Sequence, residues 1–188
     1  FTGNSGATGG AVYSWNSAAA FSNCTFANNG FKTDGGGIFA SLEEAGNTLS
    51  FDQCSFTNNY AIPGSASQRG GAVYVQAKTD NMSIAFSSCS FTGNIAKTGG
   101  AVYANNLADI YTAFTNCSFS QNTATDAGGG AVCQSAGIIS VSNSTFSYNK
   151  APYGGAIRNE GSPVLSVFNS IFNNNGSTTS GGALSLYQ

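Results

Sequence analysis

Residues 89–103, which read CSFTGNIAKTGGAVY, contain two short marks that recur along the whole chain. The first mark is F-x-x-N, formed here by Phe91 and Asn94, and the second is G-G-A-V or a close variant, which begins here at Gly99. Copies of F-x-x-N begin at Phe1, Phe26, Phe56, Phe91, Phe119, Phe146 and Phe172. Copies of the glycine mark begin at Gly9, Gly35, Gly70, Gly99, Gly129, Gly154 and Gly181.

Seven repeats of unequal length indicate a solenoid, in which turns of similar pattern stack and the loops between them vary. We expect residues 1–188 to form a single domain, because a solenoid grows by adding turns. The chain starts and stops inside repeats. We therefore expect it to be a segment of a longer repeat protein.

The composition fits stacked β-structure and excludes several classes of function. Only 7% of the residues are charged, whereas 41% are hydrophobic and 12% aromatic, which is too apolar for a disordered chain. The formal net charge of −2, with six scattered basic residues, provides no patch for nucleic acid. No apolar run reaches the length of a membrane span.

Alternation of side chains predicts three strands in each repeat. The position after the glycine mark's alanine is aliphatic in every copy, so we place it in the core, and the next position faces outward. That outward position forms an aromatic stripe of Tyr13, Phe39, Tyr74 and Tyr103. A second strand follows and ends at a bend occupied mostly by asparagine, which tolerates left-handed geometry. The third strand reads C-x-F and buries a cysteine column of Cys24, Cys54, Cys89 and Cys117.

Three strands and about 25 residues per repeat predict an all-β fold, a parallel β-helix of about seven turns. The asparagine of F-x-x-N fits an internal ladder, in which each side-chain amide bonds to the next turn and satisfies main-chain groups at the bend. The predicted ladder consists of Asn4, Asn29, Asn59, Asn94, Asn122, Asn149 and Asn175.

The paired marks G-G-A-[ILV] and F-x-x-N resemble the repeats of the chlamydial polymorphic outer-membrane proteins and, more broadly, those of pectate-lyase-like β-helices. The resemblance covers nearly the whole chain, although Gly37 replaces the alanine in one copy and Leu184 ends the last mark. It implies a right-handed β-helix, display at the cell surface or outside the cell, and adhesive or structural work. It does not imply an enzyme.

The acidic residues give little support for catalysis. Glycoside cleavage needs paired carboxylates, or a carboxylate-bound metal with a basic residue, but no acid recurs at a fixed repeat position. Histidine is absent, which excludes histidine-dependent acid–base and zinc chemistry. We expect no enzyme activity, no cofactor, no metal and no catalytic residue; a polysaccharide lyase or hydrolase is a remote alternative.

Stacked turns would set the Cα atoms of neighbouring column cysteines about 4.8 Å apart, which permits disulfides between Cys24 and Cys54 and between Cys89 and Cys117. Serine fills the same column in two later turns, and in-register neighbours hold their side chains parallel. A column of free buried thiols is therefore favoured over the disulfide alternative. Cys133 follows the aromatic stripe, so we expect it to be exposed or reactive.

Five N-x-[ST] sequons are present. Three lie in the bend column and one in a loop, so Asn23, Asn81, Asn116 and Asn143 are candidate glycosylation sites if the source is a eukaryote. The fifth, Asn175, belongs to the predicted ladder and should be buried and unmodified.

The outward columns of the third strand are rich in Ser and Thr. The aromatic stripe could stack against sugars or a partner, or it could be a partly covered ladder that supports the sheet. We predict a structural or adhesive protein outside the cell or on its surface, with a glycan- or ice-binding module as the alternative. Its expected partners are glycans or surface molecules of a host or cell. Copies could also stack head to tail into a glycosylated rod or fibril, or the same solenoid could continue.

Overall fold

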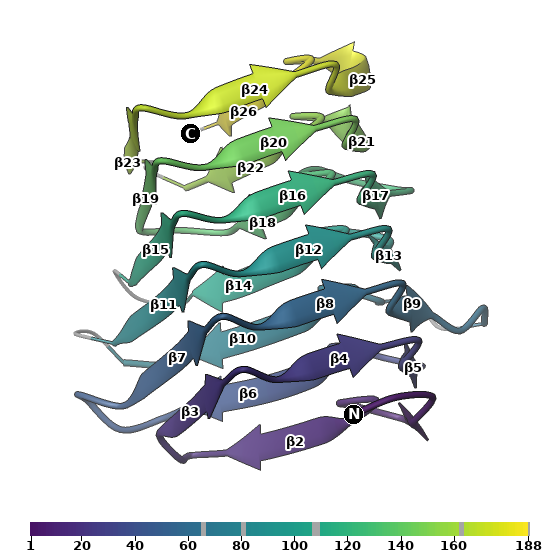
Figure 1. Cartoon of the computed structure of the whole chain (residues 1–188), viewed down its shortest axis with the longest axis vertical. Helices are drawn as coiled ribbons and strands as arrows, with labels where there is room; N and C mark the ends of the chain where they lie inside the picture. The colour runs from purple at the N-terminus through teal and green to yellow at the C-terminus, as the bar shows by residue number, and fades with distance from the viewer. Residues whose placement is uncertain (65–66, 80–81, 107–109, 162–163, 188) are drawn as a thin grey trace.

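The computed structural model describes residues 1–64, 67–79, 82–106, 110–161 and 164–187. Within these ranges the chain forms 26 β-strands and no helix, and the strand pairs run parallel. The strands form four sheets, and neighbours within a sheet come from successive turns of the chain (Figure 1). The predicted parallel β-helix is confirmed.

The first sheet begins directly after each glycine pair. Its aliphatic position is buried wherever another turn covers it, as at Val73 and Val102. The strands are β2 (Val12–Trp15), β6 (Ile38–Leu42), β10 (Val73–Ala77), β14 (Val102–Asn106), β18 (Val132–Gln134), β22 (Ile157–Glu160) and β26 (Leu184–Tyr187).

The second sheet alternates buried and outward side chains, as its period-two pattern predicts. Its strands are β3 (Ala19–Ser22), β7 (Thr48–Asp52), β11 (Ser83–Ser87), β15 (Tyr111–Thr115), β19 (Ile138–Ser142) and β23 (Val164–Phe168). Each strand is followed by a residue in the left-handed region, for example Asn23 with φ 52° and Asn116 with φ 55°. The predicted bend is therefore confirmed.

The third sheet carries the phenylalanine of F-x-x-N. Its strands are β4 (Thr25–Ala27), β8 (Ser55–Thr57), β12 (Ser90–Thr92), β16 (Ser118–Ser120), β20 (Thr145–Ser147) and β24 (Ile171–Asn173). A second left-handed residue follows each strand, such as Asn58 with φ 52° and Gln121 with φ 58°. The chain therefore turns again directly before each ladder asparagine.

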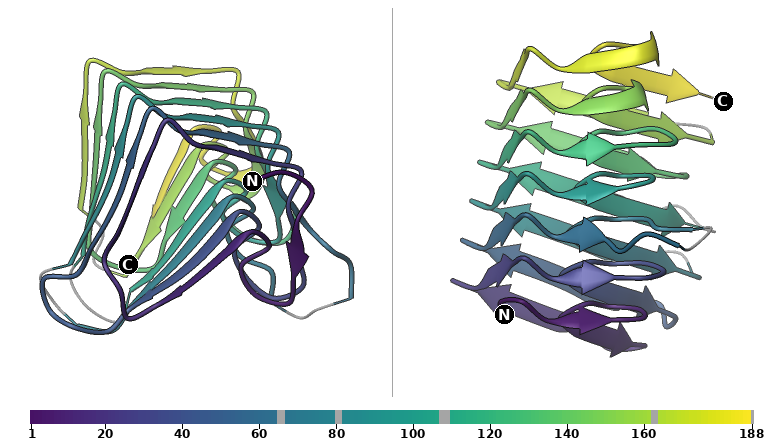
Figure 2. Two further views of the ribbon diagram at one scale, coloured as in Figure 1. Left: turned by 60° about the horizontal axis from the view of Figure 1, so that its bottom comes forward. Right: turned by 90° about the vertical axis from the view of Figure 1, so that its right-hand side faces the viewer.

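A fourth sheet follows that asparagine, and the prediction of three strands per turn is wrong in this respect. Its strands are β1 (Ser5–Gly6), β5 (Gly30–Phe31), β9 (Tyr60–Ala61), β13 (Ile95–Ala96), β17 (Thr123–Ala124), β21 (Lys150–Tyr153) and β25 (Gly176–Ser180). Two sheets have seven strands and two have six, so the chain completes between six and seven turns. In the oblique view on the left of Figure 2, the fourth-sheet segment forms a lobe beside the first sheet.

Two ladders of stacked phenylalanine rings fill the core between the second and third sheets. The rings of Phe91 and Phe119 lie parallel with centroids 4.5 Å apart, and Phe86 meets Phe91 edge to face at 5.4 Å. The third-sheet ladder contains Phe1, Phe26, Phe56, Phe91, Phe119, Phe146 and Phe172. Each ring stacks on the equivalent ring of the next turn. This stacking favours the register in which equivalent residues of successive turns are paired.

Candidate functional site

The ladder asparagines lie at the corner between the third and fourth sheets, and each one bonds across turns. The Asn59 side-chain Nδ2 donates to Asn94 Oδ1 at 2.9 Å and to the carbonyl oxygen of Phe26 at 3.0 Å. The main-chain N–H of Asn59 also donates to Asn94 Oδ1, at 3.0 Å. One side chain thus joins three successive turns and satisfies main-chain groups that no strand pairs.

Nδ2-to-Oδ1 bonds of the same kind join all seven ladder asparagines in sequence, from Asn4 to Asn175. The five inner members are fully buried: Asn29, Asn59, Asn94, Asn122 and Asn149. The outer members differ, because Asn4 is exposed and Asn175 is half-buried. Asn175 Nδ2 donates to the carbonyl oxygen of Phe146 at 2.9 Å. These amides bond to one another and to the main chain, so the ladder is structural.

The sequon asparagines of the bend column lie on the outside of the β-helix. Asn23, Asn116 and Asn143 are exposed and adopt left-handed backbone angles. Their side chains point away from the core, where an attached group would find room. Asn81 lies outside the described residues.

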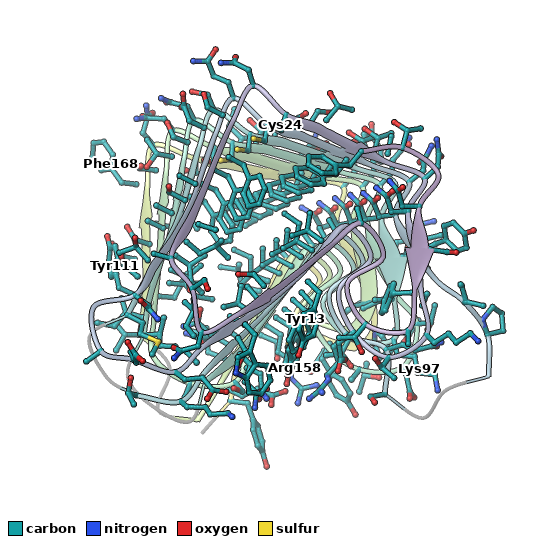
Figure 3. All side chains as sticks on the ribbon, turned by 90° about the horizontal axis from the view of Figure 1, so that it is seen from below. Tyr13, Cys24, Lys97, Tyr111, Arg158 and Phe168 are labelled. Carbon is teal, nitrogen blue, oxygen red and sulfur yellow. The ribbon has the colours of Figure 1, made fainter. Side chains whose placement is uncertain are left out.

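The column cysteines form a line of free thiols along the corner between the second and third sheets (Figure 3). The Sγ atoms of Cys54, Cys89 and Cys117 each donate to main-chain carbonyl oxygens at 3.2–3.6 Å. Ser144 continues the column and donates from its hydroxyl to the Ser142 carbonyl oxygen at 2.8 Å. Only Cys24, in the first turn, is half-buried.

Cys133 is buried, so the prediction that it is exposed is wrong. It stacks in register with Tyr103 on the outer side of the first sheet, where the fourth-sheet lobe lies beside it. Burial raises the pKa of its thiol well above the ordinary value. Since the thiolate is the reactive form, both the raised pKa and the burial make this thiol inert.

We expect a thiol-alkylating reagent to modify Cys24 first in the folded protein, because it is the only half-buried thiol among five. Cys54, Cys89, Cys117 and Cys133 should react only after unfolding. Peptide mass mapping at short reaction times, with and without denaturant, checks this result. Native labelling of Cys133 as fast as that of Cys24 would show that the fourth-sheet lobe does not cover it.

The aromatic stripe faces away from the main core, as predicted, but most of it is not available to a partner. Phe39, Tyr74 and Tyr103 are buried and form a second apolar cluster with Cys133. Neighbouring rings stack at 5.1–5.7 Å. Only Tyr13, in the first turn, is exposed, and Figure 3 shows it between the first sheet and the fourth-sheet lobe. The stripe thus serves mainly as packing between these two parts.

An ion pair lies against this cluster, between the residues that directly precede two successive glycine motifs. Arg69 Nε and Nη2 donate to the two carboxylate oxygens of Asp34, each at 2.9 Å. The guanidinium carbon lies 4.9 Å from the ring centroid of Tyr74 and 5.5 Å from that of Tyr103. The Asp34 hydrogen bond is the main cause that raises the pKa of Arg69, and burial raises the pKa of Tyr74.

We expect Asp34→Ala to lower the free energy of unfolding by about 2 kcal/mol, because it leaves a partly buried guanidinium without its paired acceptor. Thermal or urea unfolding measures the change. The matched control is Glu43→Ala, which breaks the more exposed pair with Lys78 and should give no measurable shift. An equal effect at both positions would contradict a special role for the Asp34 pair.

The described acids are dispersed. Asp34, Glu43 and Glu160 each pair with a basic side chain, and within the described residues no three acids or cysteines gather as a metal site. A surface hollow of about 340 Å³ on the fourth sheet is lined by small neutral residues, Pro152 and Lys150, and by no carboxylate. In the described part of the chain no helix is long and apolar enough to cross a membrane.

An apolar row on the outer face of the second sheet escaped the sequence analysis. Tyr111, Ile138 and Val164 are in-register neighbours and are 46%, 37% and 52% exposed. Figure 3 shows Tyr111 and Phe168 pointing outward from this face. The third sheet carries the predicted hydroxyl columns on its own outer face, with Thr25, Ser118 and Thr145 exposed. Alignment of the outward columns could have identified the apolar row.

Comparison with known proteins gives one finding. The family model described as the Chlamydia polymorphic membrane protein (Chlamydia_PMP) repeat matches residues 53–76, 88–105, 116–135, 143–160 and 169–187, which together cover just over half of the chain. No curated protein and no solved structure matches the chain. Each matched segment begins at the left-handed residue that follows a second-sheet strand and reaches the next strand of the first sheet.

Proposed function

The chain belongs to the Chlamydia polymorphic membrane protein repeat family, and from this premise we propose that it is a non-catalytic, adhesive rod segment. The repeats of this family come from outer-membrane surface proteins, which indicates a location at the cell surface. In the proposal the internal ladders keep the segment straight. The lateral sheets then present their outer columns to other molecules.

The observation that carries the proposal is the contrast between inner and outer columns. Inner positions repeat asparagine and phenylalanine across the turns and bond to one another. Outer positions vary from turn to turn, and on the second sheet they include the exposed row of Tyr111, Ile138 and Val164. Exposed apolar residues that lie together are typical of interaction sites.

Adhesion can be tested with beads that carry the purified chain, incubated with host epithelial cells. We expect the chain to increase bead retention, and the triple variant Tyr111→Ser/Ile138→Ser/Val164→Ser to reduce retention at least fivefold. The matched control is Thr25→Ala/Ser118→Ala/Thr145→Ala on the outer face of the third sheet. Retention that is equal for coated and bare beads would overturn the adhesive role.

Catalysis is tested separately with a panel of polysaccharides, from which we expect no release of reducing or unsaturated sugars. Release that survives repurification and disappears on Asp34→Ala or Glu43→Ala would instead support an enzyme. Peptide mapping of native material addresses modification: within the proposal, the exposed bend residues Asn23, Asn116 and Asn143 would carry glycans, whereas the ladder residue Asn175 would not.

Stacking of copies into a rod, or continuation of the same solenoid, is a second proposal, which the low charge of the chain favours. Only 7% of the residues are charged and the formal net charge is −2, so stacked turns would meet little charge repulsion. Electron microscopy of native material distinguishes long rods from isolated short particles, and the latter would contradict stacking.

A further inference from the structure

Three turns place fully buried polar side chains at inward positions that are apolar in neighbouring turns. On the first sheet, Gln134 and Asn159 are in-register neighbours in one inward column. The column begins with the half-buried Ser14, continues through Ala40, Val75 and Ala104, and ends with Leu186. On the second sheet, Thr112 stands where the adjacent turns have Ile84 and Ile139. The core is therefore polar at this one corner.

All three side chains are fully buried, and most of their polar atoms lack a partner. Gln134 Nε2 and Oε1, Asn159 Oδ1 and Thr112 Oγ1 make no hydrogen bond with the residues that the structure describes. Asn159 Nδ2 donates to the carbonyl oxygens of Gly137 at 3.4 Å and Val164 at 3.2 Å. Those two bonds hold the Asn159 amide beneath the corner that joins the first and second sheets.

Leaving these groups unpaired would be costly. A buried polar group without a partner destabilises the folded state, and here four atoms are affected in adjacent turns. Buried polar groups in proteins are almost always paired, either with protein atoms or with ordered water. Since no described residue pairs with these four atoms, an enclosed ligand at this corner would satisfy them.

We propose that this corner is a binding site for enclosed water molecules, held chiefly by Gln134 and Asn159. The ligand must both donate and accept, because Nε2 of Gln134 is a donor whereas Oε1 and Asn159 Oδ1 are acceptors. Water meets both needs, whereas a cation would leave Nε2 unpaired. About one buried water per 27 residues is usual, and each makes about three hydrogen bonds.

The outer surface of the same turns carries apolar side chains directly beside these inward polar ones. Tyr111 and Thr112 are adjacent in β15, with the apolar side chain outside and the hydroxyl inside, and Ile138 and Val164 continue the outer row. The ordinary partition of polar and apolar side chains is thus partly inverted at this corner. Such inversions occur where a protein departs from the sequence that would be best for folding alone. This inference does not depend on the adhesive proposal.

A crystal structure of the complete 188-residue chain at high resolution tests the site. We expect at least one ordered water within hydrogen-bond distance of both the Gln134 amide and Asn159 Oδ1. The variant Gln134→Leu should lose the water that contacts position 134. The control Gln76→Leu, at a half-buried outward position on the same sheet, should retain it.

If Gln134→Leu does not fold, NMR of the unaltered protein decides the question. Cross-relaxation between water and the Gln134 Nε2 protons, persisting longer than for exposed amides, would support an enclosed water. A dry corner, in which the Gln134 and Asn159 amides bond directly to each other or to the main chain, would overturn the proposal.

Discussion

Replacing Asn94 with alanine should lower the free energy of unfolding by about 3 kcal/mol. The Asn94 side chain accepts from the main-chain N–H and the Nδ2 of Asn59, and it donates to the carbonyl oxygen of Phe56 at 3.0 Å. Alanine removes these bonds at a fully buried position, where water cannot replace them without opening the stack. Urea unfolding followed by circular dichroism measures the loss.

The same substitution at the outer end of the ladder is the matched control. Asn4 is exposed, and after Asn4→Ala its main-chain N–H can still donate to Asn29 Oδ1. We expect a loss below about 1 kcal/mol, because solvent can reach the groups that remain. Similar losses at Asn4 and Asn94 would mean that burial does not strengthen the ladder.

Gly100→Ala should have a still larger effect, of about 4 kcal/mol, or should prevent folding. Gly100 is the second glycine of its pair. A Cβ atom there would overlap the carbonyl oxygen of Gly130 in the next turn and lie 2.7 Å from main-chain atoms of Thr123. Both obstacles are main chain held in adjacent turns, so neither can move aside as a flexible side chain could. Thermal unfolding and expression yield report the effect.

Gly176→Ala is the control for this prediction, because no atom lies within 4 Å of the Cβ position there. It should leave the melting temperature unchanged or slightly raised, since alanine restricts the unfolded chain. Equal tolerance at Gly100 and Gly176 would show that the glycine corners of successive turns are not in close contact.

The repeated motifs made the stacked architecture predictable, because each one fixes the backbone conformation or the burial of the same positions in every turn. Alternation defined the inward faces of the second and third strands, and the asparagine-rich bend column matched a left-handed residue at every copy, from Asn23 to Asn169. The ladder could be inferred because a polar residue that recurs at a buried corner needs its own copy as a partner.

The fourth sheet could not be predicted in this way. Several of its strands are only two residues long, such as Gly30–Phe31 and Ile95–Ala96, and two residues show no period. The full burial of Tyr74, Tyr103 and Cys133 could not be predicted for the same reason. Local alternation shows only that these side chains face away from the main core, whereas the lobe that covers them contains the sheet that the sequence did not reveal.

The polar corner at Gln134 and Asn159 was missed for a different reason. The second position after the aliphatic one is occupied in successive turns by Ser14, Ala40, Val75, Ala104, Gln134, Asn159 and Leu186. Period-two alternation places it on the inward side, and the β-register agrees. Because small, aliphatic and polar residues all occur in this column, its sequence gives no consistent signal.

Hydrogen exchange of side-chain amides, followed by NMR, tests the cross-turn ladder most directly. The Nδ2 protons of Asn59, Asn94 and Asn122 should exchange as slowly as the main-chain amides of the first sheet, because each is buried and bonded across turns. The exposed Asn58, next to Asn59, provides the fast internal reference. Exchange of the ladder protons at the rate of Asn58 would contradict the ladder and, with it, the rod that it holds together.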